Sequence, residues 1–439
     1  MKWVNNLRWW LADRVSPFVR GPAARHVRQR NIWHLYQDLI WLGLASAANT
    51  YITVYAIRLG ASKQLLGLQA AIPSLLMVLL RIPAAQLIER SANPKSLIVR
   101  SLQIGRMVFL LIFLLPWLAH LPLLRQIPQA ALLIWIVILM GIPSVLSSAG
   151  WDAFFAAIVP ANQRARVVST RNMLSNLIVL VVVPVMGYFL DWAVFPVNYQ
   201  VIFLLAFVGA MVSAWHVNRI EAGDLSFAPE TPQALNWQEV RRIISGSREF
   251  STLLIGTFVY QWAISISSPL FNIYFIEELG ASDSWIGWRT TLASLASIVA
   301  YRFWPRPVEQ RGERTILLLT APMMVLFPLL TGLTRTLAPN LFIVLIPRVF
   351  GAAVMLSRYN ILLRVSPAER RPTYIAIYAI LMNIAAFFAP LIGVRLADWI
   401  GIAGVFFISA ALRLTAALIY QSLPKLPAVP AGDTSPVRT

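Results

Sequence analysis

The chain repeats itself once, and this repeat constrains the fold more than any single residue does. The segment Leu59-Gly60-Ala61-Ser62 returns 220 positions later as Leu279-Gly280-Ala281-Ser282. Farther along, Asp191-Trp192 returns 207 positions later as Asp398-Trp399. At these two spacings the other landmarks are Gly67 with Gly287, Glu89 with Glu309, Pro160-Ala161 with Pro367-Ala368, Arg164 with Arg371, and Asn176 with Asn383. Two parallel copies in the same order predict two halves of the same architecture.

Composition places both halves in a membrane. Hydrophobic residues make up 58% of the 439 residues and charged residues 13%, which leaves too little polar surface to cover a soluble protein of this length. The apolar runs are mostly about 20 residues long, and a helix of that length crosses a hydrocarbon core of about 30 Å. Strands of a β-barrel would be about half as long and would alternate apolar with polar residues, which these runs do not.

The predicted fold class is therefore an all-α integral membrane protein, with twelve transmembrane helices arranged as two pseudo-symmetric six-helix bundles. The first bundle takes residues 34–218 and the second takes residues 251–422. The expected spans are 34–57, 64–88, 97–118, 129–151, 168–190 and 199–218, followed by 251–276, 284–304, 315–334, 339–363, 372–393 and 401–422.

Three segments lie outside the bundles. Residues 1–33 begin with Trp3, Leu7 and Trp10 at helical spacing opposite basic residues, a pattern typical of a helix on the anionic cytoplasmic leaflet. Residues 219–250 form a linker in which 236–250 is expected to be a short surface helix. Residues 423–439 form a cytoplasmic tail.

Basic residues fix the expected orientation. Most of them lie in the first 33 residues, the even-numbered loops and the tail, and the other side of the membrane receives only Arg58, Lys63, Arg125, Arg335 and Arg395. The positive-inside rule therefore predicts that both termini are cytoplasmic. Because the net charge of +19 is spread over many short loops as a topology signal, nucleic-acid binding is not needed to explain it.

The sequence resembles the major facilitator superfamily over nearly its whole length. The most specific match follows the eighth span, where Glu309-Gln310-Arg311-Gly312-Glu313-Arg314 fits the acidic-x-x-Gly-x-basic core of the superfamily's loop signature. The first-half counterpart is degraded: Glu89-Arg90 keeps the acidic-basic start, but Ala92 stands where glycine is usual, and the basic residue is Lys95, one step late. The resemblance implies a conformational latch in these loops.

A second resemblance is to a broad bacterial branch of the superfamily whose fourth helix has a Trp-rich end followed by a Val-Pro, Arg-rich turn. It rests on Trp151-Asp152-Ala153-Phe154, Val159-Pro160, Arg164, Arg166 and Arg171-Asn172. The pattern implies no substrate. The fold it implies has a central cavity, lined by the first, fourth, seventh and tenth helices, that opens alternately to each side.

Enzyme motifs are missing from the sequence. Cysteine is absent, and none of the four lysines stands in a Gly-x-x-x-x-Gly-Lys-Ser/Thr phosphate loop. The four histidines fall near loops or interfaces, which suggests neither a metal cluster nor a Ser-His-Asp arrangement. We therefore expect no enzyme activity, no catalytic residue, no metal and no cofactor.

Charges inside the spans are the better guide, because each costs about 2.5–3.5 kcal/mol at a helix centre. Six arginines fall there and only Asp38 and Asp152 oppose them; the arginines are Arg81, Arg106, Arg289, Arg348, Arg358 and Arg413. Arg348 lies about 13 Å into its helix, close to the bilayer midplane. It could bind an anionic group of a solute through bidentate hydrogen bonds, or it could pair within the protein and lock helices together.

Other polar residues of the spans are candidates for the cavity and for gating. Each cavity candidate could instead make an interhelical hydrogen bond worth about 0.6 kcal/mol. With Arg348, the expected cavity residues are Asn49, Thr53, Gln261, Ser265, Asn272, Tyr378 and Asn383. The expected gating or structural charges are Glu89, Arg90, Asp152, Arg171, Glu309, Arg314 and Arg358.

Two of these residue sets suggest a specific role, one as an inner gate and one in proton coupling. Arg358 and Asp152 occupy corresponding cytoplasmic helix ends in the two copies, so they could form an inner gate or a static pair. Proton coupling requires a carboxylate or histidine in the cavity that can change its charge. Asp38, about five residues into the first helix, is the candidate.

The sequence predicts a transporter that moves a small solute by alternating access. The excess of arginine favours an organic anion or an amphipathic compound. One alternative is a proton-coupled drug efflux pump, which the apolar, aromatic spans favour. Another is a non-transporting sensor or scaffold with the same fold, which would have a sealed, dry cavity. We expect a monomer in the bacterial cytoplasmic membrane, with a small-molecule solute and the lipid bilayer as its partners.

Overall fold

In the computed structural model, residues 27–221, 237–367 and 370–424 are described. The expected N-terminal surface helix and most of the tail lie outside these residues. The regular secondary structure of the described residues is helical, and ten helices are long and apolar enough to cross a membrane.

The first bundle contains six spans, two of which are divided. Its helices are α2 (Val27–Asn49), α3 (Ile52–Arg58), α4 (Lys63–Glu89), α5 (Pro94–Arg106), α6 (Val108–Phe113), α7 (Leu115–Leu118), α8 (Gln129–Ile158), α9 (Ala161–Trp192) and α10 (Val197–Arg219). The first span is α2 with α3 and the third is α5 to α7. The break after α2 contains neither proline nor glycine, and it places Tyr51 inside the protein.

The second bundle follows the same plan after a short helix, α11 (Trp237–Gly246), which falls within the segment 236–250. Its helices are α12 (Arg248–Ile273), the π-helix η1 (Tyr274–Glu278), α13 (Asp283–Phe303), α14 (Pro305–Arg311), α15 (Glu313–Thr320), the 3-10 helix η2 (Pro322–Val325), α16 (Leu326–Leu333), α17 (Leu337–Ile343), α18 (Leu345–Val365) and α19 (Arg371–Gln421).

Two features bring the ten apolar helices to the twelve predicted spans. Helix α19 contains two spans, because the backbone bends sharply at Gly401, where φ is +76° and a side chain would be strained. Helix α13 is less apolar because it carries Arg289 and a row of hydroxyl side chains, yet it packs as the eighth span. The predicted fold class is confirmed. The largest boundary errors are equal in size: the first span begins at Val27 rather than 34, the fourth ends at Ile158 rather than 151, and the fifth begins at Ala161 rather than 168.

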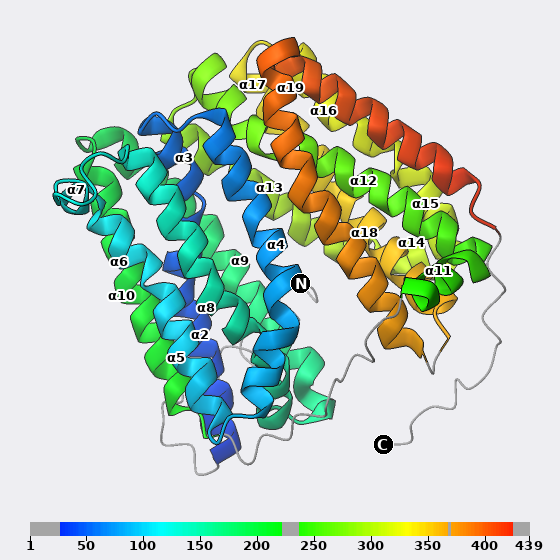
Figure 1. Ribbon diagram of the computed structural model, residues 1–439, viewed down its shortest axis with the longest axis horizontal. Helices are drawn as coiled ribbons and strands as arrows, with labels where there is room; N and C mark the ends of the chain where they lie inside the picture. The colour runs from blue at the N-terminus through cyan, green and yellow to red at the C-terminus, as the bar shows by residue number, and fades with distance from the viewer. Residues whose placement is uncertain (1–26, 222–236, 368–369, 425–439) are drawn as a thin grey trace, which may run out of the picture.

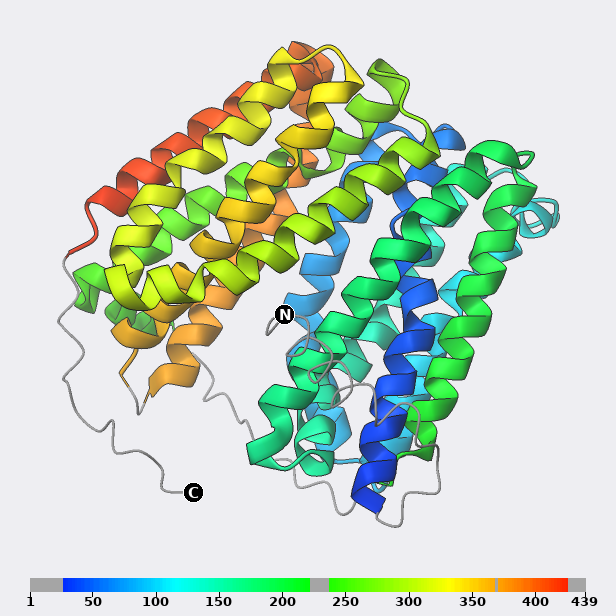
Figure 2. The same ribbon diagram turned by 180° about the vertical axis from the view of Figure 1, so that it is seen from behind.

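The packing inside each bundle repeats. In the first bundle α2 packs on α9 and α10, and α8 packs on α4 and α5. In the second bundle α12 packs on α19, and α18 packs on α13 and α15. Helices α9 with α13, and α4 with α19, join the bundles. Figures 1 and 2 show the two bundles meeting at the end where α3 and α17 lie and diverging toward the other end.

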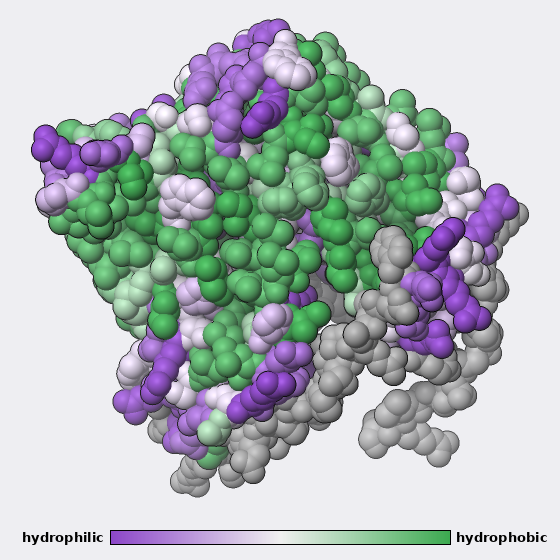
Figure 3. Space-filling model, in the orientation of Figure 1, coloured by the Kyte–Doolittle hydropathy of each residue, from purple (hydrophilic) through white to green (hydrophobic). Residues whose placement is uncertain are grey.

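The outer surface supports membrane insertion. The face drawn in Figure 3 is hydrophobic across the middle of both bundles, with hydrophilic residues at the two ends. Exposed side chains of this kind include Leu79, Val185, Val299 and Phe342. Such a broad exposed apolar surface is expected where lipid, rather than water, surrounds the protein.

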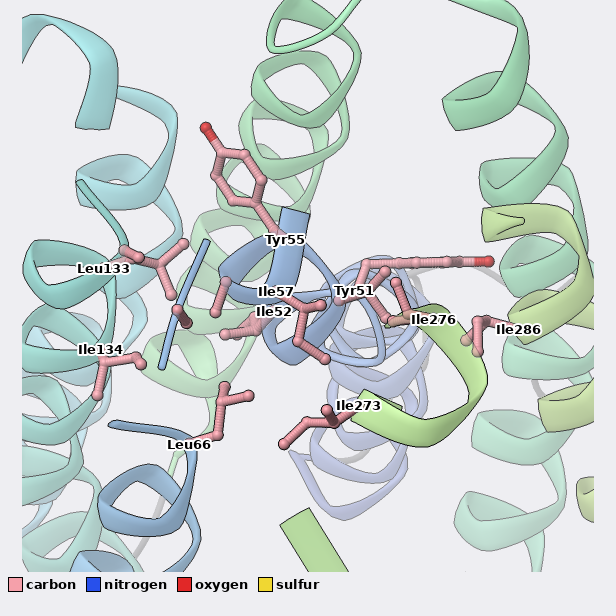
Figure 4. Close-up of a cluster of buried hydrophobic side chains, with 14 of the residues drawn as sticks. Tyr51, Ile52, Tyr55, Ile57, Leu66, Leu133, Ile134, Ile273, Ile276 and Ile286 are labelled. Carbon is pink, nitrogen blue, oxygen red and sulfur yellow. The ribbon is translucent and has the colours of Figure 1, made fainter. Parts of the chain in front are cut away.

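The buried apolar clusters show where the bundles are held together. The largest cluster contains residues of both bundles, including Tyr51, Leu66, Ile273 and Ile286, and Figure 4 shows Tyr51 reaching toward the helix that carries Ile286. The other three clusters each belong to one bundle. Hydrophobic contact therefore joins the bundles mainly at one end.

Candidate functional site

The two bundles are joined by contacts among residues 51–67, 180–199, 281–291 and 390–398, which we call the junction. The repeat's own landmarks meet there. Asp191, at the end of α9, accepts hydrogen bonds from the backbone N–H groups of Asp283 (2.8 Å) and Ser284 (3.0 Å) at the start of α13. Its copy Asp398 accepts a hydrogen bond from Gln64 (2.8 Å) and faces Lys63 (3.5 Å) at the start of α4. Each bundle therefore presents a carboxylate to a helix N-terminus of the other, where the helix dipole favours negative charge.

Asp283 is the centre of the junction. Its side chain is buried, and its Oδ2 accepts a hydrogen bond from the hydroxyl of Tyr199 (2.9 Å). Arg58 lies 3.6 Å from its Oδ1 and donates a hydrogen bond to the carbonyl of Ala281 (2.8 Å). Since Arg58 and Tyr199 belong to the first bundle and Asp283 to the second, separating the bundles at this end would expose the Asp283 carboxylate.

Small residues allow the helices to approach closely here. A Cβ atom on Gly187 would lie 2.8 Å from the carbonyl oxygen of Asp283, and one on Gly287 would lie 3.1 Å from the Cα atom of Pro184. The hydroxyl of Tyr51 donates a hydrogen bond to the carbonyl of Val183 (2.7 Å) and lies beside both glycines. Larger residues at these positions would push the bundles apart.

At the opposite end, polar contacts remain inside single bundles. Arg30 pairs with Glu221 in the first bundle, and Arg364 pairs with Glu313 (2.7 Å) in the second. Among the described side chains at this end, leaving aside Tyr36, Gln238 and Arg364, we find no hydrogen bond or ion pair between the bundles. With those three side chains set aside, the polar contacts between the bundles in the described residues thus lie at the junction.

The interior charge of the first bundle is partly balanced. Asp38 of α2 is 1% exposed and lies 3.2 Å from Arg171 of α9 and 3.5 Å from Arg106. It also accepts a hydrogen bond from Ser213 of α10. Arg171 lies over the Trp151 ring, 5.1 Å from its centroid. Because two guanidinium groups hold the Asp38 carboxylate in place, it is poorly suited to the coupling role predicted for it.

Among the described residues, the interior of the second bundle away from the junction has arginines but no carboxylate. Arg289 lies over Phe275 (4.5 Å to the centroid), and Arg413 donates a hydrogen bond to the carbonyl of Met324 (3.0 Å). Arg358 lies over Tyr260 (4.6 Å), and its Nε and Nη1 are buried without a hydrogen-bond partner. These three arginines come from three different spans, whereas the described Asp and Glu residues of this bundle lie at helix ends and in loops.

Arg348 is exposed on α18 and lies near Tyr301 of α13 and near Arg289, which carries the same charge. No hydrogen bond or ion pair joins it to another described side chain. Tyr301 ends a row of hydroxyl residues on α13, at the helical spacing that puts them on one face: Thr290, Ser294, Ser297 and Tyr301. Arg348 is therefore an accessible cation beside a polar helix face.

The other predicted cavity residues differ in their exposure and in their hydrogen bonding. Asn49 is exposed at the end of α2, and Asn272 is half-buried on α12. The remaining ones mostly bond within the protein: Thr53 accepts from Gln69 (3.3 Å), Gln261 donates to Ser265 (3.1 Å), and Asn383 donates to the carbonyl of Ala379 (2.9 Å). Tyr378 lies near Arg358.

The structure does not bring the predicted inner gate together. Asp152 is exposed, whereas Arg358 lies among tyrosines of its own bundle, so the expected pair is absent among the described residues in this conformation. Glu89, Arg90 and Glu309 are also exposed at the opposite end. Arg314 instead fastens the end of α19 through the carbonyls of Leu423 (2.8 Å) and Gln421 (3.3 Å).

Sequence reasoning missed the junction residues Arg58, Asp191, Tyr199, Asp283 and Asp398 as a functional group. Their signal was available in part, because Asp191 and Asp398 are repeat landmarks and Ser62 and Ser282 begin the helices that they face. The spacing alone did not show that the end of the fifth span meets the start of the eighth.

Comparison with known proteins gives a consistent picture. The model of the Major Facilitator Superfamily matches residues 39–255 and again residues 253–438. The multidrug resistance protein MdtG of Serratia proteamaculans is 27% identical over 189 residues, which is 42% of this chain and 43% of that protein. MdtG of Dickeya zeae is 28% identical over 181 residues, covering 40% and 44% respectively. The match thus spans less than half the length of these relatives.

Solved structures resemble nearly the whole chain. A bacterial homologue of the iron transporter ferroportin, in an inward-facing state, has a TM-score of 0.70 at 13% identity, covering 91% of this chain and 99% of that one. The nucleoside transporter NupG has a TM-score of 0.67 at 9% identity, covering 91% and 100%. At such low identity these likenesses show the fold alone.

Proposed function

Because this chain belongs to the Major Facilitator Superfamily, we propose that it is a transporter that moves a small organic anion across the membrane by alternating access. The observation that carries the proposal is the asymmetric contact between the bundles. They meet through the junction at one end. At the other end the described residues make no polar contact between the bundles, when Tyr36, Gln238 and Arg364 are left aside. Two bundles that rock about a central site would form such a contact at each end in turn.

Orientation follows from the charges of the loops. The junction end carries few basic residues, whereas the opposite end carries Arg30, Lys95, Arg219 and Arg311. The positive-inside rule places the opposite end in the cytoplasm. This conformation is then open to the inside, with the junction as the outer seal.

The second bundle supports an anionic solute. Arg348 is accessible, lies beside the hydroxyl face of α13 and has no carboxylate partner among the described residues. A guanidinium group in a membrane interior needs a counter-charge, water or a polar backbone. A carboxylate or phosphate group on the solute would supply two acceptors for its planar donors.

A thermal-shift screen tests this proposal with the purified full-length chain. Organic acids would be compared with their neutral amides at equal concentration. We expect the acids to raise the unfolding temperature saturably, because a ligand of the folded state stabilises it. Arg348→Ala should weaken binding about 10- to 100-fold, the loss of a charge-assisted hydrogen bond, and Arg348→Lys should retain part of it.

Transport must then follow. Vesicles reconstituted with the chain should take up a radiolabelled acid from the screen, and Arg348→Ala vesicles should take up far less at the same concentration. Equal stabilisation by acids and amides, or an unchanged response in Arg348→Ala, would exclude the anionic site. Binding without uptake would favour a sensor or scaffold.

Proton-coupled efflux of hydrophobic compounds is the second candidate, because the matched relatives are called multidrug resistance proteins. The paired state of Asp38 argues against it as the proton carrier. An imposed pH gradient decides the matter: a pump of this kind would expel a neutral dye only while the gradient lasts, and we expect no such dependence.

A further inference from the structure

The repeat allows the charged centre of one bundle to be compared, position by position, with the same place in the other. In the first bundle the centre consists of Asp38, Arg171, Trp151 and Ser213. The spacing of 207 leads from Ser213 to Tyr420, from Arg171 to Tyr378 and from Trp151 to Arg358. The cation and the aromatic ring have thus exchanged places between the two copies.

The carboxylate has no such counterpart. In the first bundle Asp38 contacts Ser213; in the second, the helix that corresponds to α2 contacts Tyr420 through the hydroxyl of Thr257 (3.1 Å). The spacing of 220 leads from Asp38 to Phe258, so an apolar residue and the neighbouring neutral hydroxyl of Thr257 stand where the first bundle has a negative charge. The second centre keeps the cation and loses its partner.

Arg358 is left with incomplete bonding. Its guanidinium group lies over Tyr260 (4.6 Å to the centroid), and Tyr378 and Tyr420 lie near it. Its Nε and Nη1 remain buried without a partner, and Arg413 beside the same Tyr260 also has an unpartnered Nε. A buried N–H without an acceptor is destabilising, and more so when the group is charged.

The phenol groups around Arg358 add hydrogen-bond donors to those of the guanidinium group, and a cluster of donors suits an anion. The hydroxyls of Tyr260, Tyr378 and Tyr420 can donate hydrogen bonds, and Arg358 offers two unused donors in a fixed plane. Four groups of this kind suit a compact oxyanion or halide. No ion pair joins Arg358 to a carboxylate of the described chain, and the described Asp and Glu residues of this bundle lie at helix ends and in loops.

We propose that the second bundle binds an anion beside Arg358, in the place that the carboxylate of Asp38 occupies in the first bundle. The ligand is a small anion, such as chloride, phosphate or the carboxylate of a solute. Arg348 is ten residues away on α18, about 15 Å along the helix, so this is a second site. The inference goes beyond the transport activity proposed above and does not depend on it.

The test measures the unfolding temperature of the purified full-length chain at constant ionic strength, while chloride, phosphate or acetate replaces a bulky sulfonate. We expect a saturable rise with at least one of these anions. Arg358→Gln should abolish the rise, because the cation that binds the anion is gone. Arg81→Gln, which removes an exposed arginine of the first bundle, should leave it unchanged.

A second variant supplies the missing charge. Thr257→Asp places a carboxylate beside Tyr420, as Asp38 stands beside Ser213, so it should raise the unfolding temperature without added anion and remove the anion response. This variant keeps the proposal testable if Arg358→Gln does not fold. Arg348→Ala should retain the response to inorganic anions even if it loses the response to organic acids.

The source of the anion is also decided by these measurements. Saturation by chloride or phosphate at millimolar concentration identifies a resident inorganic ion, whereas saturation by organic carboxylates alone assigns the site to a transported solute. Either result supports the site if Arg358→Gln removes it. Absence of saturation with every anion, or an unchanged response in both Arg358→Gln and Thr257→Asp, would overturn it.

Discussion

The two bundles share one topology but differ in whether their buried arginines have a carboxylate partner. The first places Asp38 between Arg106 and Arg171. The second buries Arg358 and Arg413 among aromatic rings and backbone carbonyls. Helix packing therefore survives duplication with its pattern intact, while the charges inside the helices are free to diverge. We infer that the second bundle, whose interior arginines have no described carboxylate partner, is the one that binds anions.

The largest expected effect comes from breaking the balanced centre. Asp38→Asn leaves two buried guanidinium groups without a counter-charge, and we expect a loss of about 3–5 kcal/mol in the free energy of unfolding. Denaturant unfolding in detergent measures it. Asp152→Asn, an exposed acid on α8, is the matched control and should stay within about 0.5 kcal/mol. Similar effects of the two substitutions would mean that the Asp38 centre is not what holds the first bundle together.

Arginine removal should act with opposite sign in the two bundles. Arg106→Met deprives Asp38 of one of its two cations, so it should destabilise the protein by about 3 kcal/mol or more. Arg413→Met removes a buried charge that has no acid partner, and without added anion it should be neutral or stabilising by about 1–4 kcal/mol. The comparison uses the same unfolding measurement, and equal losses in both variants would contradict the difference between the bundles.

The junction offers a smaller contrast between the copies. Asp191→Ala removes two charge-assisted bonds to backbone N–H groups and should weaken the closed junction by about 1.5–3 kcal/mol. Asp398→Ala removes contacts to two partly exposed side chains, worth about 0–1 kcal/mol. Solvent accessibility of the introduced thiol in Thr291→Cys, a buried position of the junction, reports the opening, and it should increase in the first variant much more than in the second. A larger increase in the Asp398→Ala variant would contradict the claim that the Asp191 contact is the stronger of the two.

Much of the fold could be predicted from the sequence, because apolar runs of membrane-spanning length and a repeat at fixed spacing determine twelve helices in two bundles. The prediction failed where side-chain direction or local backbone decides. The break before Tyr51 has no proline or glycine to mark it, and helix ends alone could not show that Arg358 turns toward Tyr260 and away from Asp152. A few degrees of helix rotation decide such pairs, and a single sequence does not encode that rotation visibly.

The site was predicted unevenly for the same reason. Arg348 was found because an arginine near the middle of a span is costly wherever it points. The junction was missed as a site because its parts are ordinary loop residues that gain meaning only when α9 and α13 are placed side by side. The role proposed for Asp38 was judged without its two arginine partners, which come from other helices.

The central claim is that the junction and the opposite end open in alternation. The natural chain has no cysteine, so spin labels can be attached at introduced sites alone. One pair would be Trp192→Cys with Trp399→Cys at the junction, and the other would be Arg90→Cys with Gln310→Cys at the opposite end. Pulsed electron paramagnetic resonance distances, recorded with and without a bound organic acid and in the Asp191→Ala background, should change in opposite directions at the two ends. Distances that stay fixed at both ends, or that lengthen at both ends together, would contradict the account.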